Sequence, residues 1–214
     1  MDVIIAMADD KAFTSLSDST PERKNTVIKS IIQSIIYATM DTTSVSIEWA
    51  LSELLSNPQV LGKAQEEIDT KIGTERRVEE SDLEQLPYLQ AIVKETLRLH
   101  PPGPLLVPHE STEDCVVSGF KIPAGTRLIV NAWKIHRDPR WWDRPLEFCP
   151  ERFIKGQGSS SEVDLRGQHF QFIPFGAGRK VVSWNVTCQV YPPPYNCSFA
   201  PWVRMEGPTF SVSS

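Results

Sequence analysis

One long helical stretch ahead of Asn57 constrains the fold more than any other feature. Apolar residues recur there at three- and four-residue spacing, which lines one face of a helix: Val27, Ile28, Ile31, Ile32 and Ile35. Thr20 and Pro21 suit its start, and Asn57-Pro58 stops it. At 1.5 Å per residue the predicted helix is about 50 Å long. Few helices of globular domains reach this length, and a polar pair in the middle, Thr42-Thr43, is rarer still.

Two further helices are predicted downstream. Asn57 is expected to cap the first of them, with Pro58 at its first position and Gly73 as its terminator. Ser81 and Glu84 have the spacing of a capping box before a short turn. The second helix is predicted over residues 87–100, because Pro101-Pro102 follows at once.

Residues 115–135 change the pattern. They are rich in Val and Ile and are cut by Ser118-Gly119 and by Pro123-Ala124-Gly125, which predicts short antiparallel strands. A Gly/Ser-rich linker follows at 156–161. From Val181 onward neither helical nor strand periodicity is visible, and only Arg204 and Glu206 carry charge. We expect two regions: residues 1–180, which form the folded domain, and residues 181–214, a divergent tail.

Composition excludes several classes of function. The chain of 214 residues has 22 basic and 27 acidic side chains and a net charge of −5, without a dense Lys/Arg patch, which argues against a nucleic-acid partner. The four cysteines match no zinc spacing, so reduced thiols and no metal cluster are expected. The longest apolar stretch, 31–38, falls short of the ~20 residues that a spanning helix needs. Asp2 directly follows Met1, so no signal peptide is predicted.

Four motifs occur in a specific order, and their combination is more informative than any one alone. They are Ala-Thr-Met-Asp-Thr-Thr at 38–43, Glu-Thr-Leu-Arg at 95–98, Pro-Glu-Arg-Phe at 150–153 and Phe-Ile-Pro-Phe-Gly-Ala-Gly-Arg-Lys at 172–180. Together they resemble the cytochrome P450 family, the haem-thiolate monooxygenases, in its plant-type form. His-Arg-Asp-Pro at 136–139 and Gly-Gln-His-Phe at 167–170 add to this resemblance. It implies a mainly α fold with small antiparallel β-sheets: a partial cytochrome P450 fold with a long oxygen-activating helix, the Glu-x-x-Arg helix and an incomplete haem-binding loop.

Glu95 and Arg98 are three residues apart on one helix face. Alone, the pair is most simply a surface ion pair worth a few tenths of a kcal/mol, roughly 0.3. The resemblance instead implies that Glu95, Arg98 and Arg152 form a buried network that braces the haem-binding loop. An Arg fork suits such burial because it can hold a carboxylate through two bonds.

Asp41 and Thr42 lie within the long helix, where Thr hydroxyls can simply bond back to the preceding turn. The resemblance gives them a second role, the delivery of protons during oxygen activation. Thr39 stands where the family usually has glycine, which narrows the expected oxygen pocket. By resemblance, His109 and Lys180 contact the haem propionates, although His109 alone reads as an ordinary loop histidine.

Val182 occupies the position of the family's axial cysteine, and Trp184 occupies that of the following glycine. A thiolate ligand donates electron density that promotes O–O cleavage, and valine has no donor atom. Cys188 lies six residues further on, outside a glycine-bounded loop, and Cys149 lies in a different motif. The sequence therefore predicts a chain without thiolate-bound haem, which is catalytically inactive.

The resemblance also implies a reaction and its partners. The expected family reaction inserts one oxygen atom of O2 into a small organic substrate, with haem as cofactor and electrons from NADPH through NADPH–cytochrome P450 reductase. Full-length relatives are expected at the cytosolic face of the endoplasmic reticulum membrane. The resemblance begins shortly before the long helix, so we expect no anchor, marginal stability, and a cytosolic or unstable chain.

Two alternatives remain open. In one, the functional protein is a longer, active monooxygenase in which a Cys-x-Gly sequence follows Arg179, and the residues printed there come from a retained intron or a shifted reading frame. In the other, the chain is a non-catalytic interaction module that pairs with a full-length relative or with the reductase.

Overall fold

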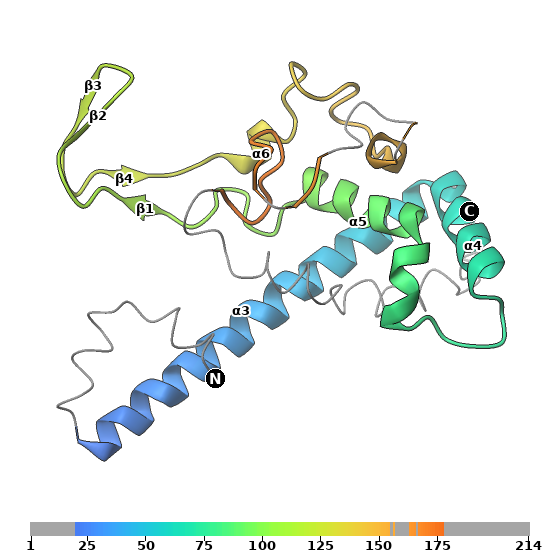
Figure 1. Ribbon diagram of the computed structural model, residues 1–214, viewed down its shortest axis with the longest axis horizontal. Helices are drawn as coiled ribbons and strands as arrows, with labels where there is room; N and C mark the ends of the chain where they lie inside the picture. Colours follow the sequence, from blue (N-terminus) through green and yellow to red (C-terminus); the bar gives the residue numbers. More distant parts are fainter. Residues whose placement is uncertain (1–19, 155, 157–162, 166, 178–214) are drawn as a thin grey trace, which may run out of the picture. The chain divides into compact units, whose positions relative to one another are not determined.

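The computed structural model describes residues 20–154, 156, 163–165 and 167–177. The chain divides into two units, Met1–Ser44 and Val45–Ser214, which are described separately below (Figure 1). Lys180, Val182, Cys188 and the predicted tail at 181–214 lie outside the described residues.

The predicted long helix is present as α3 (Pro21–Ser56), and its residues up to Ser44 belong to the first unit. Hydroxyl side chains there donate to the carbonyl four residues earlier, as in Ser30 to Thr26 at 2.9 Å. On the apolar face, Ile28 is 52% exposed and Ile32 is 44% exposed, whereas Val27, Ile31 and Ile35 are half-buried. No described helix combines the length and apolar character needed to cross a membrane.

Helix α4 (Pro58–Lys71) begins and ends where the sequence predicts, but its cap differs. The Asn57 side chain makes no capping bond; its Nδ2 donates to the Glu53 carbonyl at 2.8 Å instead. The Val60 N–H, which a side-chain cap could accept, donates instead to the Asn57 carbonyl at 2.9 Å, so it is satisfied without such a cap. Gly73 follows the helix with φ of +80°, a conformation that strains any residue with a Cβ.

The 3-10 helix η1 (Glu80–Gln85) precedes α5 (Pro87–Leu99). The predicted capping box at Ser81 and Glu84 is wrong, because the reciprocal bonds form between Glu79 and Asp82. The Glu79 N–H donates to Asp82 Oδ2 at 2.8 Å, and Arg76 holds both Asp82 oxygens. This guanidinium lowers the pKa of Asp82 to about 2.

Helix α5 is buried on most of its surface, because apolar clusters pack on two of its sides. The first cluster joins it to the end of α3 and to α4 through residues that include Leu54, Ile68, Leu89 and Ile92. The second joins it to later loops through Ala91, Leu97, Trp142, Phe153 and Phe172. The polar side chains of α5, among them Glu95 and Arg98, are therefore buried between these clusters, and they form the candidate site described below.

The described residues contain two antiparallel pairs of short strands, and short antiparallel strands are what the sequence predicts for this region. Strand β1 (His109–Glu110) pairs with β4 (Arg127–Leu128), and β2 (Cys115–Val117) pairs with β3 (Phe120–Ile122). The β2–β3 hairpin lies at the end of the β1–β4 pair remote from α6 (Figure 1). The expectation of a mainly helical fold with small antiparallel sheets is confirmed.

The predicted strand region extends too far. Residues 132–135 form a helical turn, α6 (Ala132–Ile135), rather than a strand. Asn131 Oδ1 accepts the N–H of Lys134 at 2.9 Å, and this local cap favours a turn over an extended chain.

Candidate functional site

Arg98 on α5 has every one of its donors bonded within the protein. Its Nε and Nη2 donate to the two Glu95 oxygens, at 2.7 and 2.9 Å. Its Nη1 donates to the carbonyls of His136 and Pro145, both at 2.7 Å, and Nη2 also donates to the Glu147 carbonyl at 3.1 Å. A guanidinium has five N–H groups, so Arg98 is fully satisfied.

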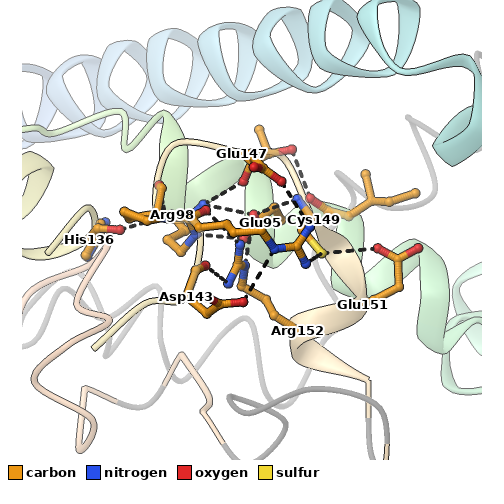
Figure 2. Close-up of polar contacts among 12 residues, drawn as sticks. Glu95, Arg98, His136, Asp143, Glu147, Cys149, Glu151 and Arg152 are labelled. Atoms are coloured by element: carbon orange, nitrogen blue, oxygen red, sulfur yellow. Dashed lines mark hydrogen bonds and ion pairs between the residues drawn. The ribbon is translucent and has the colours of Figure 1, made fainter. Parts of the chain in front are cut away.

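Glu95 is the centre of the network (Figure 2). Its Oε1 accepts from Arg152 Nε at 3.1 Å and from the Cys149 N–H at 2.8 Å, in addition to Arg98. Arg152 comes from η2 (Pro150–Phe153) and also donates to the carbonyl of Asp143 at 2.8 Å. The carboxylate thus ties α5 to the loop that leads into η2.

Burial makes these hydrogen bonds important for the stability of the fold. The side chains of Glu95 and Arg98 are both 0% exposed, and that of Arg152 is 4% exposed. Two cations share one carboxylate there, so removal of the carboxylate would leave uncompensated buried charge. The Trp142 ring lies beside both guanidinium groups, with its centroid 5.2 Å from Arg98 Cζ and 6.0 Å from Arg152 Cζ.

A second set of contacts joins η2 to α4 and α5. Glu151 Oε1 accepts from Lys63 Nζ at 2.6 Å and from the Tyr88 hydroxyl at 3.0 Å. Burial, followed by the neighbouring Glu151 carboxylate, raises the pKa of Tyr88. The side chain of Lys63 is 54% exposed, so this pair contributes less than the buried network does.

Only some of the predicted site residues lie together in the described part of the structure. The structure brings Glu95, Arg98 and Arg152 together. Asp41 and Thr42 belong to the first unit, where both are exposed and the Thr42 hydroxyl donates to the Ala38 carbonyl at 2.8 Å. His109 is exposed in β1, where it pairs with Leu128 rather than lying in a loop.

Sequence reasoning missed the groups that complete the network. The carbonyls of Asp143, Pro145 and Glu147 accept the remaining guanidinium donors, and every residue type carries such a carbonyl. His136 belongs to a motif that the sequence displays, but its contacts with both Arg98 and Ile173 could not be inferred from that motif.

The described residues do not fit a thiolate ligand for haem. Cys115 is exposed in β2. The Cys149 Sγ lies 3.5 Å from Glu151 Oε2 and 3.6 Å from Arg144 Nη2, and burial raises the pKa of this thiol. Within the described ranges, no group of three or more His, Cys, Asp or Glu side chains could hold a metal ion.

A buried Glu–Arg–Arg network on a central helix, joined to a Pro-Glu-Arg-Phe turn, places the chain with the haem-thiolate monooxygenases that its motifs resemble. The family model for cytochrome P450 matches residues 1–181. The chain belongs to the cytochrome P450 family.

Curated relatives from plants agree with this assignment. The chain is 51% identical over 191 residues to a 3,9-dihydroxypterocarpan 6A-monooxygenase from Glycine max, across 87% of this chain and 36% of the relative. It is 55% identical over 157 residues to a nicotine N-demethylase from Nicotiana tomentosiformis, across 73% of this chain and 29% of the relative. The chain therefore spans about a third of the length of these relatives.

Solved structures show the same fold. A zebra fish cytochrome P450 with progesterone matches 78% of this chain and 34% of its own chain, with a TM-score of 0.60 and 34% identity. A second zebra fish structure, with abiraterone, matches with a TM-score of 0.61. Haem is the cofactor of this family.

Proposed function

We propose that this chain is a segment of a haem-dependent monooxygenase that has kept the structural network of the family and lost its thiolate ligand. The parent reaction inserts one oxygen atom of O2 into a small organic substrate. The names of the plant relatives, a pterocarpan monooxygenase and a nicotine demethylase, support this substrate class. The chain shares about a third of their length, so the reaction is assigned to the parent protein.

The observation that carries the proposed inactivity is Val182, which stands where the family has its axial cysteine. A hydrocarbon side chain offers no lone pair to iron. Neither cysteine of the described residues replaces it, because Cys115 is exposed on a hairpin and Cys149 has its thiol beside Glu151 and Arg144. No chemical step is assigned to haem in this chain.

The retained residues have different proposed roles. Glu95, Arg98 and Arg152 hold the loop before η2 on α5, and this scaffold role does not require bound haem. Asp41 and Thr42 are the proposed proton-delivery residues of the parent enzyme. His109 and Lys180 are its proposed propionate contacts.

Electrons in the parent enzyme are proposed to come from NADPH through NADPH–cytochrome P450 reductase. The endoplasmic reticulum membrane is its proposed location. Both proposals rest on the family resemblance of the motifs at 95–98, 150–153 and 172–180.

A reduced carbon monoxide difference spectrum tests the proposed inactivity. The purified full chain is mixed with haem, and we expect no Soret band of the thiolate type. The matched variant Val182→Cys with Trp184→Gly restores the Cys-x-Gly spacing, and we expect it to gain that band. A thiolate-type band from the unaltered chain would refute the proposed inactivity, while the family assignment would stand.

A further inference from the structure

His136 contacts two parts of the second unit through different atoms. It follows α6 directly and is 0% exposed. Its carbonyl accepts from Arg98 Nη1 at 2.7 Å, which joins its backbone to the buried network. Its ring Nε2 lies 3.0 Å from the N–H of Ile173. One residue therefore connects α5 to the segment at 172–176.

The bond to Ile173 determines the state of the imidazole. A peptide N–H can only donate, so Nε2 must keep its lone pair and accept. The neutral ring then carries its proton on Nδ1, and protonation of Nε2 would set one N–H against another. Burial, followed by the nearby positive charges of Arg98 and Arg137, lowers the pKa of His136 to about 4. The backbone carbonyls of Arg98 and Leu97 lie near the ring and act in the opposite direction, since they raise this pKa.

The segment at 172–176 packs through Phe172, which is fully buried in the second apolar cluster, and two local backbone bonds shape its turns. The N–H of Phe172 donates to the His169 carbonyl at 2.8 Å, and that of Gly176 donates to the Ile173 carbonyl at 3.0 Å. Both bonds close local turns. The His136 ring fixes a backbone group of these turns to a distant element, and it also lies against Phe172, with the ring centroids 5.5 Å apart.

We propose that His136 is a positioning residue, whose Nε2 lone pair fixes the Ile173 N–H and so places the 172–176 segment relative to the Arg98 network. The Arg98 guanidinium holds the His136 backbone through its carbonyl. The His136 ring in turn holds the backbone of the 172–176 segment, which precedes Arg179 and Lys180 in the sequence. The role stands on contacts among described residues, so it holds whether or not the chain binds haem.

A residue that merely fills space would act differently. His136→Leu keeps an apolar side chain of similar reach but offers no acceptor. His136→Gln places an amide oxygen near the position of Nε2 and can accept the same N–H. If His136 has a positioning role, the Gln variant restores the acceptor for the Ile173 N–H that the Leu variant removes. If the residue only fills space, the apolar Leu variant preserves the structure better than the Gln variant does.

Nuclear magnetic resonance of the isotope-labelled full chain tests the proposal. In the unaltered protein we expect scalar coupling across the hydrogen bond between the Ile173 nitrogen and His136 Nε2, and a proton on Nδ1. In His136→Leu, the Ile173 amide should exchange about tenfold faster or more, relative to the amides of α5, because a buried N–H loses its acceptor. In His136→Gln the same ratio should stay within about threefold of the unaltered value, since an acceptor is restored.

Two results would overturn the assignment. One is a proton on Nε2 of the unaltered protein, or no coupling to Ile173; this measurement decides the matter even if His136→Leu does not fold. The other is equal acceleration of the Ile173 amide in the Leu and Gln variants. Neither result bears on the carbon monoxide spectrum, so the proposed loss of the thiolate ligand is tested separately.

Discussion

Substitution of Glu95 by glutamine is the sharpest test of the buried network. The carboxylate is 0% exposed and accepts four hydrogen bonds, two from Arg98 and one each from Arg152 and the Cys149 N–H. Glu95→Gln keeps the shape of the side chain, removes the negative charge and turns one acceptor into a donor that faces other donors.

The expected cost follows from this geometry. Two buried guanidinium groups lose their shared counter-charge, and loss of one partner of a buried pair typically costs about 3–5 kcal/mol. Since total folding stability is only about 5–15 kcal/mol, the variant should lose much of it.

Urea unfolding followed by far-ultraviolet circular dichroism measures the change. We expect a large fall in the midpoint of Glu95→Gln, with little change in the slope against urea. Glu84→Gln on the exposed side of η1 is the matched control and should behave as the unaltered protein. If the free energy of unfolding of Glu95→Gln lies within about 1 kcal/mol of that of the unaltered chain, the shared carboxylate is not what holds the two arginines.

Three further predictions follow from the same contacts. The folded-state pKa of His136, about 4, lies below its ordinary value of 6.5, so the unfolded chain binds more protons between these values. The contribution of His136 to the free energy of unfolding should therefore be fully present above pH 6.5 and fall by up to about 3 kcal/mol as the pH drops to 4. Equal slopes of the unfolding free energy against pH for the unaltered chain and His136→Gln would contradict this. Arg98→Lys should cost about 3 kcal/mol or more in urea unfolding, because three donors replace five; an unchanged midpoint would show that the fork is dispensable. In thermal melts, Gly62→Ala within α4 should stabilise by about 0.5–1 kcal/mol, whereas Gly73→Ala at positive φ should destabilise by about 1 kcal/mol, and shifts of equal sign would refute the backbone explanation.

The sequence alone was sufficient for the elements whose signals are local. Prolines mark the first residues of α3, α4 and α5, because proline lacks the N–H that the first turn leaves unbonded. The spacing of Glu95 and Arg98 puts both on one helix face. The sequence also determines the predicted lack of a thiolate at Val182, since the donor depends on residue type.

Local signals failed where the sequence offers more than one local structure. Several acidic and hydroxyl side chains near η1 have capping spacing, and Arg76 beside Asp82 favours the Glu79–Asp82 box over the predicted one. The turn at α6 interrupts a run of apolar residues that reads as a strand, because one capping contact from Asn131 outweighs a weak strand preference.

Only the tertiary structure decided how the network is completed. The carbonyls that satisfy Arg98 come from residues 38 to 49 positions away in the sequence, and a carbonyl has no signature in residue type. The bond from Ile173 to the His136 ring spans 37 positions and joins a backbone group to a side chain that could equally have faced water. Such partners are chosen by the packing of α5 against the loops, since burial obliges each polar group to find whichever complement lies within reach.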